Sequence, residues 1–149
     1  MKNLDQRNQI IEYSLKLNST SLSPLRSGNI SLRGREDETE GYLITPSGKK
    51  YETLKPEDIV FVFLNEEPEN NKSTNKPSSE WRFHRDIYVN KEEADAIVHA
   101  HSPHATAVSS HGKSIPPFHY MIALAGGDDI KCAESVSYTH LTLPTKRIV

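Results

Sequence analysis

The segment IVHAHSPHATA (97–107) limits the possible folds of this chain more than any other segment does. An apolar run ends in two histidines separated by one residue, His99 and His101, and a serine and a proline follow. The apolar run DAIVHAH predicts a buried strand, and Ser102 with Pro103 predicts the N-cap and first residue of a helix. We therefore expect polar side chains where a strand ends before a helix, a common location for sites in α/β sheets.

Helical and strand patterns alternate over the rest of the chain. Apolar residues at near-helical spacing predict a helix over 4–17, and alternation predicts strands over 29–33 and 42–45. The continuous apolar run 58–64 predicts a buried central strand. Because short turns join several of these strands, we expect the α/β class, with a helix-flanked central sheet that is mixed but mainly antiparallel.

Three further segments complete the expected organisation. SSEWRFHRDIYVN predicts a helix capped by Ser78 or Ser79, and MIALAGG (121–127) predicts a strand that ends in a glycine turn. The polar residues 65–74 predict a flexible surface loop.

The end of the chain, VSYTHLTLPTKRIV (136–149), does not continue the preceding pattern and is similar to translated sequencing-adapter DNA. We expect it to be non-native. The alternative is a genuine polar tail. Residues 1–135 are then expected to form one domain, incomplete at its C-terminal side.

Composition excludes several classes of function. The formal net charge is -2 and the pI is near 6.4, so no basic field points to nucleic acid or an anionic membrane. No apolar run approaches the length of a membrane span, and the N-terminus carries charges where a signal peptide needs an apolar core. The one cysteine, Cys132, excludes an internal disulfide. A cytoplasmic protein is expected.

The two histidines predict a metal site. Side chains two positions apart on a strand share a face, so His99 and His101 can chelate zinc or a similar divalent ion. The alternative is a pair of half-buried histidines bonded to backbone or water. His104, in the next helix, is expected to line the site or face solvent, and His111 and His119 are expected in loops.

A catalytic zinc site needs at least three protein ligands. Glu80 is the best nearby carboxylate; it could bind the metal at rest and act as a base when substrate displaces it. The alternative role for Glu80 is a negative charge that complements the N-terminus of a helix.

Three turns have the composition of anion sites: SGN (27–29), TPSG (45–48) and PSS (77–79). Each combines small residues, hydroxyls and backbone N–H groups that can bind phosphate. One such turn alone is a weak signal, because most turns of this kind bind nothing.

Taken together, these motifs resemble the class II aldolase/adducin family. The resemblance extends from about residue 5 to 133, with the motifs in the family's order: SGNISLR (27–33), YLITPSG (42–48), KPSSEWRFHRDIY (76–88), AIVHAHSPHATAVS (96–109) and IPPFHYMIALAGGDDIKCA (115–133). It implies a three-layer sandwich with a mainly antiparallel sheet, and a cyclic homotetramer with its sites at subunit boundaries.

The resemblance also implies roles for single residues. His99 and His101 match the paired zinc ligands, and Glu80 matches the acid/base carboxylate. The positions that match the family's substrate-phosphate site are Gly28, Asn29, Ser47, Gly48, Ser78 and Ser79. The family's third zinc histidine lies further downstream. It is not carried over to His140, which lies in the expected non-native tail.

The activity implied is a lyase reaction: zinc-dependent, reversible aldol cleavage of a ketose 1-phosphate or similar sugar phosphate to dihydroxyacetone phosphate and an aldehyde. Glutamate at position 80 favours an aldolase or a dehydratase over the related 4-epimerases, which have aspartate there. The alternatives are an epimerase or dehydratase of the same fold, or a non-catalytic adducin-like interaction module. Without the downstream ligand, the present chain is expected to bind zinc weakly and to be inactive.

Overall fold

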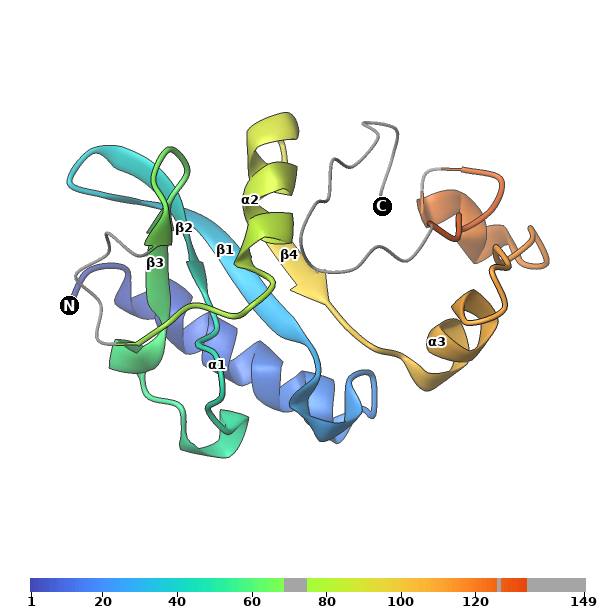
Figure 1. Ribbon diagram of the computed structural model, residues 1–149, viewed down its shortest axis with the longest axis horizontal. Coiled ribbons are helices and arrows are strands. Elements are labelled where there is room, and N and C mark those ends of the chain that lie inside the picture. Colours follow the sequence, from blue (N-terminus) through green and yellow to red (C-terminus); the bar gives the residue numbers. More distant parts are fainter. Residues whose placement is uncertain (69–74, 126, 134–149) are drawn as a thin grey trace. The chain divides into compact units, whose positions relative to one another are not determined.

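The computed structural model describes residues 1–68, 75–125 and 127–133 (Figure 1). The chain divides into two compact units, Met1–His101 and Ser102–Val149, and each is described by itself. Most of the loop predicted over 65–74, and the whole of the tail predicted over 136–149, lie outside the described residues. The domain boundary at residue 135 therefore stays a prediction.

The first unit is built on a four-stranded sheet in the order β3-β2-β1-β4, in which every neighbouring pair is antiparallel. The strands are β1 (Asn29–Glu36), β2 (Thr39–Ile44), β3 (Val60–Phe63) and β4 (Ala96–His99), and the α-helices are α1 (Leu4–Ser19) and α2 (Trp81–Asn90). Short 3-10 helices span Pro24–Arg26, Tyr51–Thr53 and Pro56–Asp58. The predicted α/β class with a mainly antiparallel sheet is confirmed.

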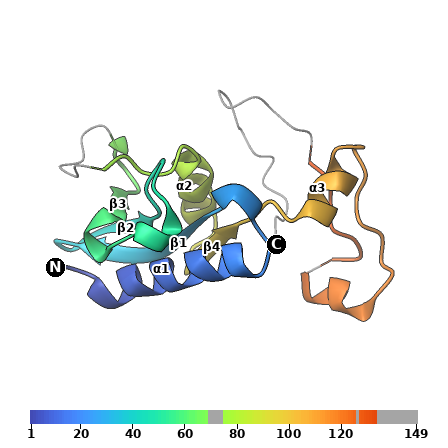
Figure 2. The same ribbon diagram turned by 90° about the horizontal axis from the view of Figure 1, so that it is seen from below.

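The two long helices cover opposite faces of the sheet (Figure 2). Strand side chains alternate between two apolar clusters, as the pleat requires. Leu43 and Phe61 pack with Ile10 of α1, and Tyr42 and Val62 pack with residues of α2. The result is the predicted three-layer arrangement of helix, sheet and helix.

Two strand predictions are corrected by the structure: the central position of one strand and the burial of another. The run 58–64 forms β3 at an edge of the described sheet, where it pairs with β2, and not in its centre. Its continuous apolar pattern has another cause, because both faces of β3 are covered by an apolar cluster. DAIVHAH forms the strand β4, but the prediction that this strand is buried is wrong: β4 lies at the other edge of the described sheet, and Val98 is 57% exposed because the α1 cluster does not extend to it.

The start of α2 also differs from the prediction. The N-cap is Glu80, not Ser78 or Ser79, and no side chain caps the helix. Ser78 lies before the helix: its N–H donates to the Thr45 carbonyl, which ties residues 76–78 to the end of β2, and its Oγ accepts from the N–H of Glu80, the N-cap itself. The helix therefore begins only after this attachment.

In the second unit, α3 (Pro103–Ser109) begins as predicted, with Ser102 as N-cap and Pro103 as its first residue. The strand predicted over 121–127 is wrong: Tyr120–Ala125 form a 3-10 helix. A short apolar run fits either structure, and here a local bond from the Ile122 N–H to the His119 carbonyl forms instead of a strand ladder. None of the described helices has the length and apolar character of a membrane span.

Two glycines face each other across β1 and β2 and provide a matched test of the packing. A Cβ on Gly41 would lie 2.4 Å from the Val62 carbonyl oxygen, whereas a Cβ on Gly34 would first meet the flexible Gln6 side chain at 3.1 Å. We predict that Gly41→Ala lowers the free energy of unfolding by about 1–3 kcal/mol, and that Gly34→Ala costs less than about 1 kcal/mol. Urea denaturation measures both; equal losses would contradict the packing described.

Candidate metal centre

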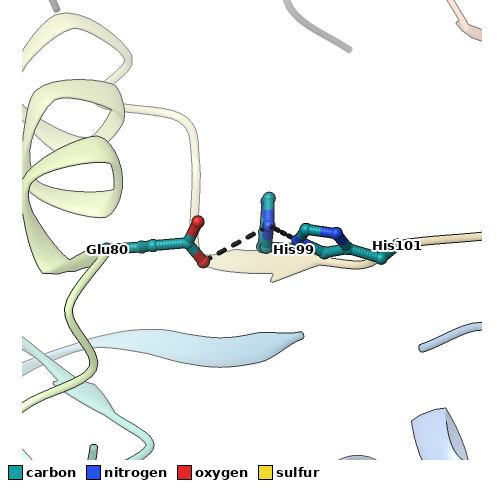
Figure 3. A group of neighbouring side chains, drawn as sticks. All are labelled: Glu80, His99 and His101. Carbon is teal, nitrogen blue, oxygen red and sulfur yellow. Dashed lines mark hydrogen bonds and ion pairs between the residues drawn. The ribbon is translucent and has the colours of Figure 1, made fainter. Parts of the chain in front are cut away.

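The position of His99 follows from strand pairing. Asn29 of β1 lies directly opposite His99 of β4, and residues opposite each other in an antiparallel pair share a face. His99 is therefore on the face covered by α2. His101 is two residues further on, just beyond the strand, and the Nε2 atoms of the two rings are 2.8 Å apart (Figure 3). The expected projection of both rings to one side is confirmed.

Glu80 joins these histidines from a segment far away in the sequence. As the N-cap of α2, it directs its carboxylate towards the end of β4, and its Oε2 lies 3.3 Å from His99 Nε2 (Figure 3). One ligand atom from each of Glu80, His99 and His101 lies within 4.8 Å of the others. Among the residues that the structure describes, this is the one group of three metal-binding side chains gathered so closely.

The donor set of this cluster fits zinc. Two imidazole nitrogens and one carboxylate oxygen are a combination found in catalytic zinc sites. Ligand atoms about 2.0–2.1 Å from a tetrahedral zinc ion lie about 3.4 Å from each other. The Glu80–His99 distance of 3.3 Å meets that spacing, the 2.8 Å between the two histidine nitrogens must open slightly, and Glu80 and His101 lie within 4.8 Å of each other.

The surroundings favour the form of His99 that binds metals. Burial lowers the pKa of His99 below its ordinary value of 6.5; the Glu80 carboxylate acts in the opposite direction, and His101 lowers the pKa further. The ring is therefore neutral near pH 7, with a lone pair available to a metal ion.

Behind the carboxylate lies a row of buried polar side chains, Asn29, Ser31, His84 and Tyr88, which we call the polar row. Asn29 Nδ2 donates to Glu80 Oε2 at 2.5 Å, and Asn29 Oδ1 lies 2.5 Å from His84 Nε2. Ser31 Oγ lies 2.6 Å from His84 Nδ1 and 2.8 Å from the Tyr88 hydroxyl. A continuous chain of hydrogen bonds thus runs from the core to Glu80.

Burial keeps both titratable members of the polar row neutral. It lowers the pKa of His84 to about 3, with a smaller contribution from the neighbouring His99, and raises the pKa of Tyr88 to about 12. No role for His84 or Tyr88 was predicted from the sequence. The available signal was the spacing: Glu80, His84 and Tyr88 recur every four residues, and Asn29 and Ser31 every two.

The structure also brings together two of the three predicted phosphate turns. Ser47 N–H donates to the Lys76 carbonyl and Ser78 N–H to the Thr45 carbonyl, so the turn containing Ser47 and Gly48 lies beside the one containing Ser78 and Ser79. These two N–H groups are thereby used and are not available to an anion. The phosphate role of these turns stays a prediction.

The third turn lies beside the metal cluster. A Cβ on Gly28 would lie 2.5 Å from the His99 carbonyl oxygen, so this position requires a glycine for β1 to approach β4. Asn29 follows it and contacts Glu80. The exposed His104, His111 and His119 belong to the second unit and are not members of the cluster.

The buried His84 predicts a specific dependence of stability on pH. Its pKa is about 3 in the folded chain and about 6.5 when unfolded, so between these values the unfolded chain binds one more proton. We predict that the free energy of unfolding falls as pH drops from about 6.5 towards 3, by at most about 1.4 kcal/mol per pH unit from this group.

The His84→Gln variant lacks this titration, so its difference in unfolding free energy from the wild type should shrink as pH falls. Urea denaturation at a series of pH values measures this difference. His104→Gln removes an exposed histidine and should follow the wild-type curve. Parallel curves for wild type and His84→Gln would contradict the neutral, buried state of His84.

The sequence is similar to that of known enzymes. Residues 8–148 match the family model described as "Class II Aldolase and Adducin N-terminal domain". The chain is 44% identical over 130 residues to L-fuculose phosphate aldolase of Escherichia coli (strain K12), covering 87% of this chain and 57% of that protein. It is 41% identical over 125 residues to 5-methylthioribulose-1-phosphate/5-deoxyribulose-1-phosphate aldolase of Rhodospirillum rubrum, covering 84% of this chain and 53% of that protein.

Solved structures agree in fold. An L-fuculose 1-phosphate aldolase superimposes with a TM-score of 0.82 at 35% identity, covering 93% of this chain and 63% of the other. The chain thus spans a little more than half the length of the curated relatives it matches. The match to the family model over 8–148 shows that this chain belongs to the class II aldolase and adducin family.

Proposed function

We propose that the whole protein catalyses the zinc-dependent, reversible aldol cleavage of a ketose 1-phosphate or similar sugar phosphate, giving dihydroxyacetone phosphate and an aldehyde. The observation that carries this proposal is the convergence of Glu80, His99 and His101, whose ligand atoms lie within 4.8 Å of one another. The names of the relatives support the substrate class, because both are aldolases named for sugar phosphates.

The residues of the chain divide the chemistry between them. His99, His101 and Glu80 would hold the zinc ion, which supplies a Lewis acid for the negative charge that develops on the substrate carbonyl oxygen. Glu80 also accepts and donates a proton beside the metal site. It returns a proton to the carbon that loses its bond to the aldehyde, and removes it in the direction of condensation.

The paired turns would bind the substrate phosphate. The hydroxyls of Ser47, Ser78 and Ser79, with Gly48, lie on two turns that are bonded to each other, and the Glu80 N–H donates to Ser78 Oγ at 3.3 Å. This bond connects the phosphate turns to the acid/base residue. A phosphate held here would orient the rest of the substrate towards the metal cluster, so that binding far from the reacting bond assists its cleavage.

Two alternatives remain within the family: an epimerase or dehydratase of the same fold, and a non-catalytic interaction module. Glutamate at position 80 favours the aldolase or dehydratase over the 4-epimerase, and the gathered ligand set argues against a scaffold. Exchange of a dihydroxyacetone phosphate proton with solvent separates the enzymes, since an aldolase catalyses it and its absence would reject the aldolase. A cytoplasmic homotetramer belongs to the same proposal and is tested by solution mass and cell fractionation.

The metal proposal predicts different effects for the histidines of IVHAHSPHATA. His99→Ala or His101→Ala should remove stoichiometric zinc from the whole protein, because each variant leaves one imidazole in the cluster. His104→Ala removes an exposed histidine outside the cluster and should retain zinc. Metal analysis after dialysis measures the content. Equal zinc content in all three variants would exclude the cluster as the site.

The acid/base role predicts that Glu80→Gln retains zinc but loses turnover in the whole protein by at least about a hundredfold. Both histidines stay in place, whereas an amide cannot take up or release the proton. Glu93→Gln makes the same chemical change at an exposed position and should leave turnover unchanged. Cleavage assays with a ketose 1-phosphate measure the rates. Full activity of Glu80→Gln would remove Glu80 from this role.

A further inference from the structure

We propose that His84 is a positioning residue: through Asn29 it sets the orientation of the Glu80 carboxylate towards His99, so that the three ligands are arranged before a metal binds. The inference rests on the proposed function for the identity of the ion, but not for the arrangement of the side chains. It assigns a role to a histidine that does not contact the metal cluster through any hydrogen bond of its own.

The orientation of the Asn29 amide follows from hydrogen-bond chemistry. A carboxylate only accepts hydrogen bonds, so the atom of Asn29 that faces Glu80 Oε2 at 2.5 Å must be Nδ2. Oδ1 then faces His84, and the His84 atom 2.5 Å away, Nε2, must carry the hydrogen. The reversed amide would place two acceptors against each other at Glu80.

The contacts on the other side of the His84 ring agree with this assignment. With its hydrogen on Nε2, the neutral ring offers an acceptor at Nδ1, and the Ser31 hydroxyl donates to it at 2.6 Å. The Tyr88 hydroxyl in turn donates to Ser31 Oγ at 2.8 Å. Every donor in the row therefore has an acceptor, and only one ring orientation satisfies both of its nitrogens.

Burial makes these bonds obligatory. His84 is 1% exposed and Asn29 is 3% exposed, so solvent has little access to replace a lost bond. Without the His84 N–H, Asn29 Oδ1 would lack its donor, and the amide would rotate to find another one. The bond to Glu80 would then be lost as well.

The Glu80 oxygen that Asn29 holds is the one that matters for the cluster. Oε2 accepts from Asn29 and is also the atom 3.3 Å from His99 Nε2. Among the described residues, no hydrogen bond is made to Oε1. Asn29 therefore selects which carboxylate oxygen faces the histidines, and His84 determines which end of Asn29 does so.

The first test uses NMR on the metal-free chain and needs no enzyme activity. Long-range proton–nitrogen spectra should show a neutral His84 ring with hydrogen on Nε2. The side-chain amide resonance of Asn29 should shift in both His84→Gln and Glu80→Ala, while Glu80→Ala leaves the His84 tautomer unchanged. Hydrogen on Nδ1, or an Asn29 resonance insensitive to Glu80→Ala, would overturn the proposal.

The second test measures the zinc affinity of the whole protein, wild type and variants, by competition with a chelator. His84→Leu, which has no donor, should weaken binding about tenfold to a hundredfold, the range typical of residues that orient metal ligands. His84→Gln offers an amide donor and an oxygen acceptor in place of the ring nitrogens, so it should recover most of the affinity. Equal affinities of wild type and His84→Leu would overturn the proposal.

Tyr42→Phe separates positioning from simple destabilisation. The Tyr42 hydroxyl donates to the Trp81 carbonyl at 2.8 Å and so stabilises α2 from outside the polar row. This variant should lose stability and keep its zinc affinity; an affinity loss as large as that of His84→Leu would show a merely structural role and overturn the proposal. If His84→Leu does not fold, the proposal is decided by the NMR test, that is, by the Asn29 resonance in His84→Gln and the His84 tautomer in the wild type. If the wild type binds no zinc, the proposed function fails, and the NMR test alone decides the role of His84.

Discussion

The spacing of side chains on one face of a strand nearly equals their spacing along one face of a helix, and the architecture around the metal cluster depends on this match. Two residues of a strand advance by about 6.7 Å and four residues of an α-helix by about 6.0 Å. Asn29 and Ser31 of β1 therefore stay level with Glu80, His84 and Tyr88 of α2, and each polar atom meets its partner. Since Glu80 lies one helical turn before His84 on the same face of α2, the packing of α2 on the sheet is also what positions the acid/base residue.

The register of β1 determines both halves of the cluster at once. Asn29 contacts Glu80 through its side chain and lies opposite His99 through the strand ladder. A shift of β1 by one residue would turn Asn29 and Ser31 to the other face of the sheet. It would also move Ile30 out of the apolar cluster against α1. The burial of Ile30 on one face thus stabilises the arrangement of polar groups on the opposite face.

The spacing of residues along the chain predicted those features that involve only one helix or strand. The helix near the N-terminus, the β1 alternation and the common projection of His99 and His101 all follow from residues close in sequence. The placement of Glu80 beside His99 depends on which strands pair, and no spacing along the chain reports that. For a related reason β3 was expected at the centre of the sheet: burial of both its faces by apolar clusters produces the same apolar run as a central position.

The polar row shows a different limit. A serine at an alternate position of a strand is usually a solvent-facing residue, and a tyrosine on a helix is usually an apolar contact. Here Ser31 and Tyr88 are buried and bonded to each other, which becomes visible only when the helix and strand are placed together. Each of these groups would be costly to bury alone, and the row is stable because every member has a partner.

The hydrogen bonds of the cluster determine which side chains must move when an ion binds. His99 and His101 are bonded to each other through the same nitrogens that would bind zinc, so this bond must be replaced. The hydrogen bond from Asn29 to Glu80 can stay when zinc binds, because a carboxylate oxygen can accept a hydrogen bond and bind a metal at the same time. The carboxylate can thus stay on its buried support while the two rings separate slightly. The position of Glu80 is then determined by the fold, and the histidines make the adjustment.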